Sequence, residues 1–517
     1  MYITNNIRMK VIFGVLILLN IISIYYLFRY GYMQRVAKMV QQSQKPLCKD
    51  CHVLLISLDT LGAKHLPCYG YDRDTAPNLC AFAKENIFFE KAYAHSNDTL
   101  LSHVSIFTGL YPSNHQVLVP NADALSRNIP FLPEILQHHG YETVFYMPPN
   151  DDYLPIDLVY NRGITEINTD GYDSENYFDK AWKQLADNNK AGKKTFLFFH
   201  TYYVHDPYFI EDRPKLYTSE IFLDIPLKVK DVFYPHFTKA FYEFFVQELE
   251  IAMKQRQFGF RTESMKNVFN AIKDKPFDEA EIAFEKALES ENISKDYFTS
   301  FYYTFFYFYR LDKEDFSQVE YLKSLYDQKI HELDETLLAK VIQAVNSSSF
   351  KDKLVVIITA DHGEAFMEHG SLSHSTLHEE ILKVPLIMYM PGKQAITVKD
   401  PVQSVDLFPT VLDFLGISST YALDGVSLLP FLNSYTIFRE NRNRLIIIDD
   451  KNKGGTQQKV FLKIPWKVFS LKEGDNYIPY ELFNIENDPD EKNNVLTSNM
   501  NIATDIIQSY KRDYLRK

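Results

Sequence analysis

Two short apolar runs, each followed at once by an aspartate, most constrain what this chain can fold into. The first is CHVLLISLDT, which ends near Asp59, and the second is KLVVIITADHGE, which runs into Asp361. Runs of this length rich in Val, Ile and Leu are typical of strands buried on both faces of a parallel sheet. Because ligands bind at the carboxyl ends of strands in open α/β sheets, we expect both aspartates at a ligand-binding edge.

The rest of the chain supports an α/β fold with a doubly wound, mostly parallel sheet flanked by helices. Strand-type segments such as VLLISL and FLFFH alternate with helical patterns such as FLPEILQHHG. A stretch dense in Phe and Tyr predicts a helical insertion, and short apolar runs near the end predict a small C-terminal antiparallel sheet. The predicted organisation is a membrane anchor at 1–30, a linker at 31–50, a main domain at 51–440 with the insertion at 209–320, and a C-terminal subdomain at 441–517.

The charge of the chain excludes one class of partner. Among 517 residues, the net charge is -12, whereas a nucleic-acid-binding protein is expected to carry a basic face. An anionic substrate is still compatible with this charge, because a metal ion and a few histidines can reverse the sign of the field locally.

The N-terminus carries an uncharged apolar run, VIFGVLILLNIISIYYLF, over residues 11–28. Its length is at the low end for a membrane-spanning helix, which needs about 20 residues. No A-x-A cleavage site follows, so we predict an uncleaved single-pass anchor, with a long signal peptide as the alternative.

The four cysteines leave their chemistry open. Cys48 and Cys51 form a C-x-x-C before the first strand, and Cys68 and Cys80 flank the loop behind it. Two disulfides are possible in an exported domain, and three pairings are allowed. Free thiols are an alternative, and a zinc site made of all four is less favoured than either.

A nucleophile and a metal site are predicted from the polar residues near these strand ends. Thr99 precedes a helix-like stretch, where a hydroxyl is well placed to attack an anion stabilised by free backbone amides. Asp59, Thr99, Asp361 and His362 would together suit Zn²⁺ or Mn²⁺ rather than Ca²⁺. Taken singly, an Asp behind a strand and a Thr before a helix are more often caps.

The order of motifs along the chain resembles the sulfatase branch of the alkaline phosphatase superfamily. The resemblance covers roughly residues 51–205 and 320–495 and leaves the insertion unmatched. It rests on segments that include TAPNLCAFAKENIFFEKAYA, FLFFHTYYVHDPY, ADHGEAFMEHGSLSHSTLHEEILKVPLIMYMPG and ELFNIENDPDEKNNV. The resemblance implies that the domain at 51–440 is catalytic.

The chain departs from that family's pattern at the nucleophile. Formylglycine-dependent sulfatases carry Cys or Ser there, then Pro and Arg, where this chain has Thr99, Leu101 and His103. Since only a primary CH₂ group can be oxidised to the formylglycine aldehyde, Thr99 is expected to act directly. A Thr nucleophile looks instead like that of the phosphoethanolamine and glycerophosphate transferases, where the Thr oxygen attacks phosphorus.

Three histidines are candidates for meeting the charge of the reacting group. His205 and His374 match positions where the family contacts the anion or its leaving group, and His103 follows Thr99 by about one helical turn. Either His205 or His374 could act as general acid, or with His103 form a second metal site. His200, in the strand FLFFH, is as compatible with a core histidine as with a functional one.

Three functions follow as expectations. The leading one is a metal-dependent hydrolase of phosphate or sulfate esters that works through Thr99 and a covalent intermediate, with phosphorus favoured over sulfur. The second is a membrane-anchored phosphotransferase that modifies an envelope lipid or glycan, with its catalytic domain outside the cytoplasm. The third is a non-catalytic binding module, suggested by Thr60 where sulfatases commonly have a second Asp.

Overall fold

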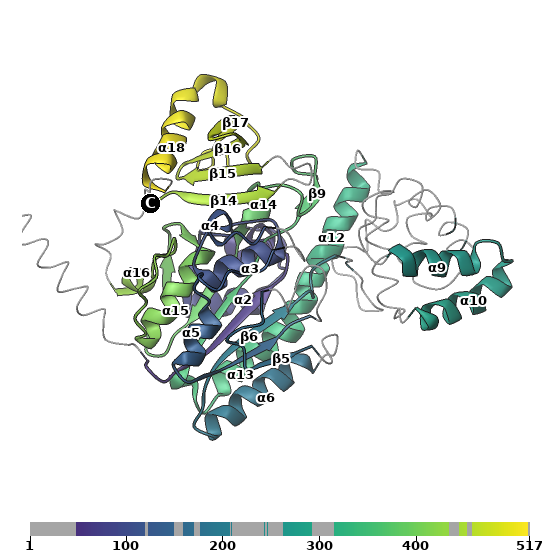
Figure 1. Cartoon of the computed structure of the whole chain (residues 1–517), viewed down its shortest axis with the longest axis horizontal. Helices are drawn as coiled ribbons and strands as arrows, with labels where there is room; N and C mark the ends of the chain where they lie inside the picture. Colours follow the sequence, from purple (N-terminus) through teal and green to yellow (C-terminus); the bar gives the residue numbers. More distant parts are fainter. Residues whose placement is uncertain are drawn as a thin grey trace, which may run out of the picture.

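The predicted α/β fold is confirmed. The computed structural model describes residues 48–118, 123–148, 159–169, 176–206, 208, 242, 246, 262–291, 315–433, 444–451 and 457–514. Its main element is an eight-stranded sheet with the order β12-β2-β11-β7-β1-β6-β4-β5, flanked by helices (Figure 1). Five neighbouring strands are parallel, namely β7 (Leu354–Thr359), β1 (His52–Leu58), β6 (Lys194–Thr201), β4 (Tyr141–Tyr146) and β5 (Glu166–Asn168).

One side of the sheet departs from the parallel pattern. Strand β11 (Leu386–Tyr389) runs antiparallel to both β7 and β2 (Ile87–Phe89), and β12 (Ile396–Val398) lies parallel to β2 at the edge. Smaller sheets are formed by β10 (Lys383–Val384), β3 (Ala92–Tyr93) and β13 (Val402–Gln403), and by β8 (Ala365–Phe366) with β9 (Leu372–Ser373).

The register of the central strands brings their carboxyl ends level. Ser57 of β1 pairs with Thr359 of β7, and Leu58 pairs with Thr201 of β6. Every residue of β1 is buried, as expected for an apolar run covered on both faces. The segments behind these three strands therefore emerge side by side at one edge of the sheet.

Helix α3 (Thr99–Thr108) begins and ends at clear sequence signals. The carboxylate of Asp98 accepts a hydrogen bond from the backbone N–H of Leu101 at 3.1 Å, which is a standard N-cap. The helix ends at Gly109, whose φ of 67° lies in the left-handed region that glycine adopts without strain. All ten residues of α3 are buried, so its N-terminus is held firmly against the sheet.

The main domain contains further α-helices. They are α2 (Pro77–Glu85), α4 (Pro112–His115), α5 (Leu132–His138), α6 (Tyr177–Lys190), α12 (Phe316–Leu333), α13 (Ala339–Ser347), α14 (Glu379–Leu382), α15 (Leu407–Leu415) and α16 (Leu429–Asn433).

The predicted C-terminal antiparallel sheet is also confirmed. It contains β14 (Ile446–Lys451), β15 (Gln457–Lys463), β16 (Trp466–Glu473) and β17 (Asn476–Asn484), with α18 (Met500–Asp513) packed on it (Figure 1, yellow). The buried Lys467 joins this sheet to the main domain, because its Nζ lies 2.9 Å from Glu491 Oε1 and 3.3 Å from Glu379 Oε1. The boundary at 440 stays a prediction.

Part of the predicted helical insertion lies within the described residues. Helices α9 (Thr262–Ile272) and α10 (Phe277–Ser290) are drawn beyond α12, apart from the sheet (Figure 1). The remaining residues of the range 209–314 lie almost entirely outside the described part of the chain, so the extent of the insertion stays a prediction.

The prediction of a single-pass membrane protein is contradicted. The described ranges contain no helix that is both long and apolar enough to cross a membrane. Helix α12, with 18 residues, carries Glu, Lys and Asp side chains along its length, which a bilayer interior does not accommodate. The segment proposed as the anchor, residues 1–30, lies outside the described residues.

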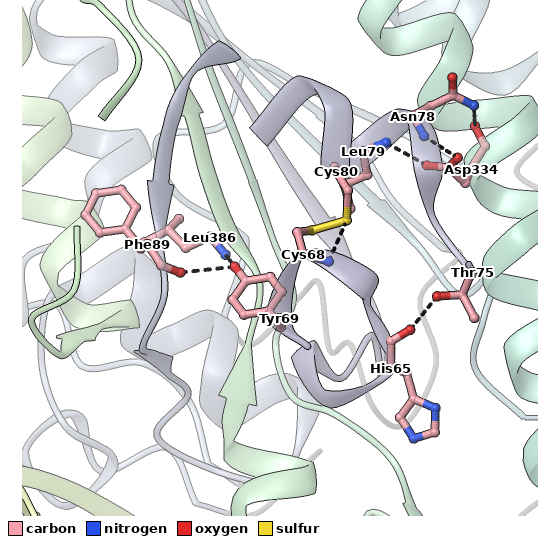
Figure 2. The surroundings of a disulfide bond; sticks show 10 residues. All are labelled: His65, Cys68, Tyr69, Thr75, Asn78, Leu79, Cys80, Phe89, Asp334 and Leu386. Carbon is pink, nitrogen blue, oxygen red and sulfur yellow. Dashed lines mark hydrogen bonds between the residues drawn. A yellow bond between two sulfur atoms is a disulfide. The ribbon is translucent and has the colours of Figure 1, made fainter. Parts of the chain in front are cut away.

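All four cysteines are paired, as Cys48–Cys51 and Cys68–Cys80. The second disulfide ties the turn behind β1 to α2 (Figure 2). The same helix is capped from a distance, since Asp334 accepts hydrogen bonds from the backbone N–H groups of Asn78 and Leu79, each at 2.8 Å (Figure 2). The disulfide and the contacts of Asp334 with α2 therefore fix the end of the segment that follows β1.

We predict that the two disulfides stabilise the protein unequally. Cys68–Cys80 joins residues 12 apart, whereas Cys48–Cys51 joins residues 3 apart. Because the entropy removed from the unfolded chain grows with the closed loop, Cys68→Ala with Cys80→Ala should lower the free energy of unfolding by about 3 kcal/mol. The matched Cys48→Ala with Cys51→Ala change should cost about 2 kcal/mol. Urea unfolding of the oxidised proteins measures both, and equal losses would contradict the prediction.

Candidate active site

Four polar side chains from separate parts of the chain meet at the carboxyl edge of the sheet. Asp59 follows β1, Asp361 and His362 follow β7, and Thr99 is the first residue of α3. The hydroxyl of Thr99 donates to Asp59 Oδ2 at 3.2 Å, and His362 Nε2 lies 3.5 Å from the same hydroxyl oxygen. Thr99 keeps 8% exposure whereas the other three are fully buried, so Thr99 is the member that faces outward.

The carboxylate of Asp361 is held by backbone groups on one oxygen only. Its Oδ1 accepts from the N–H of His362 at 2.9 Å and from that of Thr60 at 3.2 Å. Its Oδ2, like Asp59 Oδ1, is buried and has no hydrogen-bond partner among the described residues. One ligand atom from each of Asp59, Asp361 and His362 lies within 4.8 Å of the others. This set fits a divalent cation, because buried carboxylate oxygens without donors need a compensating charge.

Electrostatics within this group also favour a bound cation. Burial raises the pKa of Asp59, and the neighbouring Asp361 carboxylate raises it further. Burial opposes ionisation of Asp361 as well, but the positive charge of His362 holds its pKa below the usual range. Burial would lower the pKa of His362, but the carboxylates of Asp361 and Asp59 raise it above the ordinary value. The two buried carboxylates therefore repel each other, and a cation bound between them would reduce that repulsion.

The glycine after His362 is required by close packing. A Cβ at Gly363 would lie 2.1 Å from the carbonyl oxygen of Glu380, well inside any normal contact. The N–H of Gly363 donates to Ile381 O at 2.7 Å, which fixes the loop against α14. Only glycine lets the backbone that carries Asp361 and His362 approach this closely.

His103 lies one helical turn after Thr99 in α3 and contacts β1. Its Nε2 is 2.9 Å from Ser57 Oγ, and its ring centroid is 4.5 Å from that of His200. Burial, with the nearby His200, lowers the pKa of His103 to about 3, so this imidazole is neutral. The catalytic role of His103 stays a prediction.

His200 is a site residue for which the sequence left a core position and a functional role equally open. Its Nε2 lies 3.4 Å from Asp59 Oδ2, and its Nδ1 donates to Ser57 O at 3.2 Å. The signal was available, because His200 ends an apolar run whose strand, β6, lies beside β1. The order of the strands, which makes β6 and β1 neighbours, could not be predicted from the sequence.

His205 and His374 come together on the more open side of the site. Their ring centroids are 5.5 Å apart, and that of His374 is 4.7 Å from that of His362. Their side chains are 27% and 30% exposed, so a ligand entering from solvent meets them first.

These two histidines carry different charges. Burial alone would lower the pKa of His205, but the carboxylate of Asp206, 2.9 Å from its Nδ1, raises that pKa well above the usual value. Burial and the neighbouring His362 instead lower the pKa of His374 well below its usual value. The pair thus offers one imidazolium and one neutral imidazole at the entrance.

A tyrosine from α12 holds the turn that follows Asp59. The hydroxyl of Tyr326 donates to Thr60 O at 2.6 Å and accepts from the N–H of Gly62 at 3.0 Å. Thr60 has a φ of 57°, a left-handed conformation that a β-branched residue adopts only when its surroundings hold it there. The N–H of Thr60 donates to Asp361 Oδ1. Tyr326 therefore holds the turn that follows Asp59 and that also contacts Asp361.

Comparison with protein families gives two matches. The family model described as "Sulfatase" matches residues 52–417, and the model described as "N-sulphoglucosamine sulphohydrolase, C-terminal" matches residues 367–514. Among curated proteins, arylsulfatase K of Homo sapiens is 31% identical over 185 residues, which are 34% of this chain and 34% of that protein. Arylsulfatase K of Mus musculus is 29% identical over 201 residues, 38% of this chain and 36% of that protein. These alignments span about a third of the length of the curated relatives.

Comparison with solved structures extends over nearly the whole chain. A protein solved in complex with its substrate D-glucosamine-2-N,6-O-disulfate superposes with a TM-score of 0.62 at 18% identity, covering 91% of this chain and 99% of that one. The phosphonate monoester hydrolase of Agrobacterium radiobacter gives a TM-score of 0.57 at 18% identity, covering 90% and 95%. At these identities the likeness supports the fold.

We predict that Tyr326→Phe weakens the site more than it weakens the fold. The change removes both hydroxyl contacts with the turn, so metal affinity or turnover should fall about 10- to 100-fold. Tyr146→Phe is the matched control, because it removes one partly buried hydroxyl contact, with Gln184, at the end of β4, which lies two strands away from β1. Metal titration and thermal unfolding of both variants separate the two effects. Equal behaviour of the two variants would refute the positioning role.

Proposed function

The chain belongs to the sulfatase family, and from that premise we propose that it is a metal-dependent hydrolase of anionic esters with Thr99 as nucleophile. One observation carries the proposal: Thr99 Oγ1 lies 3.2 Å from Asp59 Oδ2 and 3.5 Å from His362 Nε2. As the first residue of α3, Thr99 also lies at the positive end of the helix dipole, which favours negative charge. The names of the relatives, arylsulfatase and phosphonate monoester hydrolase, support the same reaction class.

Asp59, Thr99, Asp361 and His362 are the residues proposed to hold the cation. Two carboxylates, an imidazole and a hydroxyl suit Zn²⁺ or Mn²⁺, whereas Ca²⁺ prefers six to eight oxygen ligands. Thr60, in place of a second Asp, removes one oxygen ligand that a calcium site would use. A cation bound here would lower the pKa of the Thr99 hydroxyl and offset the charge of the ester.

The side chains around Thr99 divide the remaining work. The hydrogen bond to Asp59 orients the Thr99 hydroxyl and gives its proton an acceptor as Oγ1 attacks. His205, kept protonated by Asp206, meets the negative charge that develops on the reacting group and is placed to donate a proton to the leaving oxygen. His374, neutral and 4.7 Å from His362 between ring centroids, serves as the acceptor for a proton from the second nucleophile.

Phosphorus is the favoured reacting atom. Oxidation at the secondary carbon of Thr99 would yield a ketone, so the chain has no formylglycine and no hemiacetal route to release sulfate. The ester formed on Thr99 must then be broken by a second attack at phosphorus or sulfur. Phosphate esters support two successive in-line displacements at a metal site. We therefore propose a phosphate ester substrate, with an aryl sulfate as the competitor in the test.

Two other outcomes differ from this proposal in one measurable step. Transfer to an alcohol would give a new ester when ethanolamine or glycerol is added, whereas hydrolysis gives free phosphate only. A non-catalytic module would turn over no ester and would hold no stoichiometric metal. The unpartnered carboxylate oxygens of Asp59 and Asp361 favour a bound cation over an empty relic.

We predict that Thr99→Ala lowers kcat for the preferred ester by at least about 1,000-fold, because it removes the attacking oxygen. The assay compares an aryl phosphate monoester, an aryl phosphate diester, an aryl phosphonate and an aryl sulfate, each with Zn²⁺ or Mn²⁺. Ser102→Ala is the matched control, since its hydroxyl lies on the same helix and donates to Ser96 O at 3.3 Å. Near-native turnover by Thr99→Ala would reject the nucleophile, and preference for the sulfate would reject phosphorus.

We also predict that Asp206→Asn moves the alkaline limb of the pH profile to lower pH. Asp206 raises the pKa of His205, so His205 stays protonated until the pH rises through that raised value. Without this carboxylate, burial dominates and the proton is lost at lower pH. Asp187→Asn, at an exposed carboxylate paired with Lys183, is the control. A kcat/KM profile whose alkaline limb does not move in Asp206→Asn would remove His205 from the mechanism.

A further inference from the structure

A second group of metal-type side chains lies outside the site around Thr99. His369 lies in the turn between β8 and β9, His378 precedes α14, and Glu380 lies within α14. One ligand atom from each lies within 4.8 Å of the others, and His369 Nε2 is 3.6 Å from Glu380 Oε1. Below, these three residues are called the His369 cluster.

The carboxylate of Glu380 lacks a compensating partner. The residue is 2% exposed, and neither of its carboxylate oxygens, nor Nε2 of His369, has a hydrogen-bond partner among the described residues. Its neighbour Glu379 is also buried, but it lies 3.3 Å from Lys467 Nζ. Burial raises the pKa of Glu380 to about 8. A carboxylate built into the core without a donor or a lysine needs a cation or a proton.

The donor set of the cluster points to zinc. Two imidazoles and one carboxylate are one of the ligand sets found in three-residue zinc sites, which leave a fourth position open. With bonds of about 2.0–2.1 Å, tetrahedral ligand atoms lie roughly 3.3 Å apart, close to the 3.6 Å between His369 Nε2 and Glu380 Oε1. Glu481 Oε2, 3.9 Å from His378 Nε2, supplies a further oxygen within reach of the fourth position.

Binding requires one adjustment of the rings. The imidazoles of His369 and His378 are stacked at 3.6 Å with an angle of 7° between their planes. Two parallel rings cannot both point a nitrogen at one ion, so one ring must turn about its Cβ–Cγ bond. That torsion is broad in histidine, and the turn relocates no backbone.

We propose that His369, His378 and Glu380 form a second, structural metal site that takes Zn²⁺ and is separate from the site around Thr99. The site would join three elements: the β8–β9 turn, α14 and the C-terminal sheet. The sheet takes part because the ring of His378 packs against those of Phe469 and Phe483, with centroids 4.6 and 5.9 Å away. Through the carbonyl of Glu380, which abuts Gly363, the bound ion would also support the loop of Asp361 and His362.

The test counts metal sites in the full chain. Metal-free protein is titrated with Co²⁺, whose visible absorption reports tetrahedral coordination, and with Zn²⁺ by calorimetry. Asp361→Asn is the background, because it removes a ligand of the other candidate site and leaves the His369 cluster intact. We expect this variant to keep one tetrahedral site, and Asp361→Asn with Glu380→Gln to bind at least about 100-fold more weakly. The control Asp361→Asn with Glu379→Gln should keep the site.

Thermal unfolding provides a second readout that does not depend on catalysis. Zn²⁺ should raise Tm of Asp361→Asn and leave that of the variant with added Glu380→Gln unchanged. Without metal, Glu380→Gln should unfold at the same or a higher temperature than the parent, because an amide replaces an unpaired buried carboxylate. Loss of all metal binding in Asp361→Asn alone, or unchanged binding after Glu380→Gln, would overturn the proposal and leave the role of Thr99 untouched.

Discussion

The structure depends on the placing of two carboxylates, Asp59 and Asp361, behind adjacent parallel strands. The register between β1 and β7 makes their meeting unavoidable, and burial makes their shared charge costly. The surrounding elements reduce that cost. The N-terminus of α3 points to the carboxylates, and histidines from three segments partly offset their charge. A divalent cation bound as proposed would complete the balance, so the residues that are costly to bury are also those on which the proposed chemistry depends.

Several other buried carboxylates in the described chain have a lysine or an arginine as their partner. Arg444 lies 2.6 Å from Asp406, Lys459 lies 2.7 Å from Asp449, and Lys467 lies between Glu379 and Glu491. In each of these groups a lysine or an arginine of the protein itself offsets the charge of a carboxylate. The ion-pair contacts of Asp59, Asp361 and Glu380 within the described residues are instead with histidines, at 3.4, 3.7 and 3.6 Å. That contrast is the physical ground for distinguishing ion pairs that stabilise the fold from the groups proposed to bind a cation.

The central sheet and the four residues of the site were predictable because both rest on local patterns. A buried strand that ends in Asp and a hydroxyl at a helix start can each be recognised within about ten residues. Tyr326 and His200 were not predictable in the same way. Their roles depend on which strands and helices become neighbours, and Tyr326 reaches a turn 264 residues away in sequence. The apolar N-terminal run suggested a membrane protein, whereas the described helices include none that could cross a bilayer.

Glu380 links two neighbourhoods with different parts of one residue. Its carbonyl oxygen presses on Gly363, and its carboxylate turns toward His369. A displacement of Glu380 would therefore move both the loop at Gly363 and the carboxylate beside His369, because the contact with Gly363 is tightly packed. If each side binds its own ion and the ion on one side changes the affinity of the other, thermodynamic reciprocity makes the effect in the reverse direction the same factor. A structural ion would then act as an effector, and the metal supply of the cell would set how readily the catalytic ion is retained.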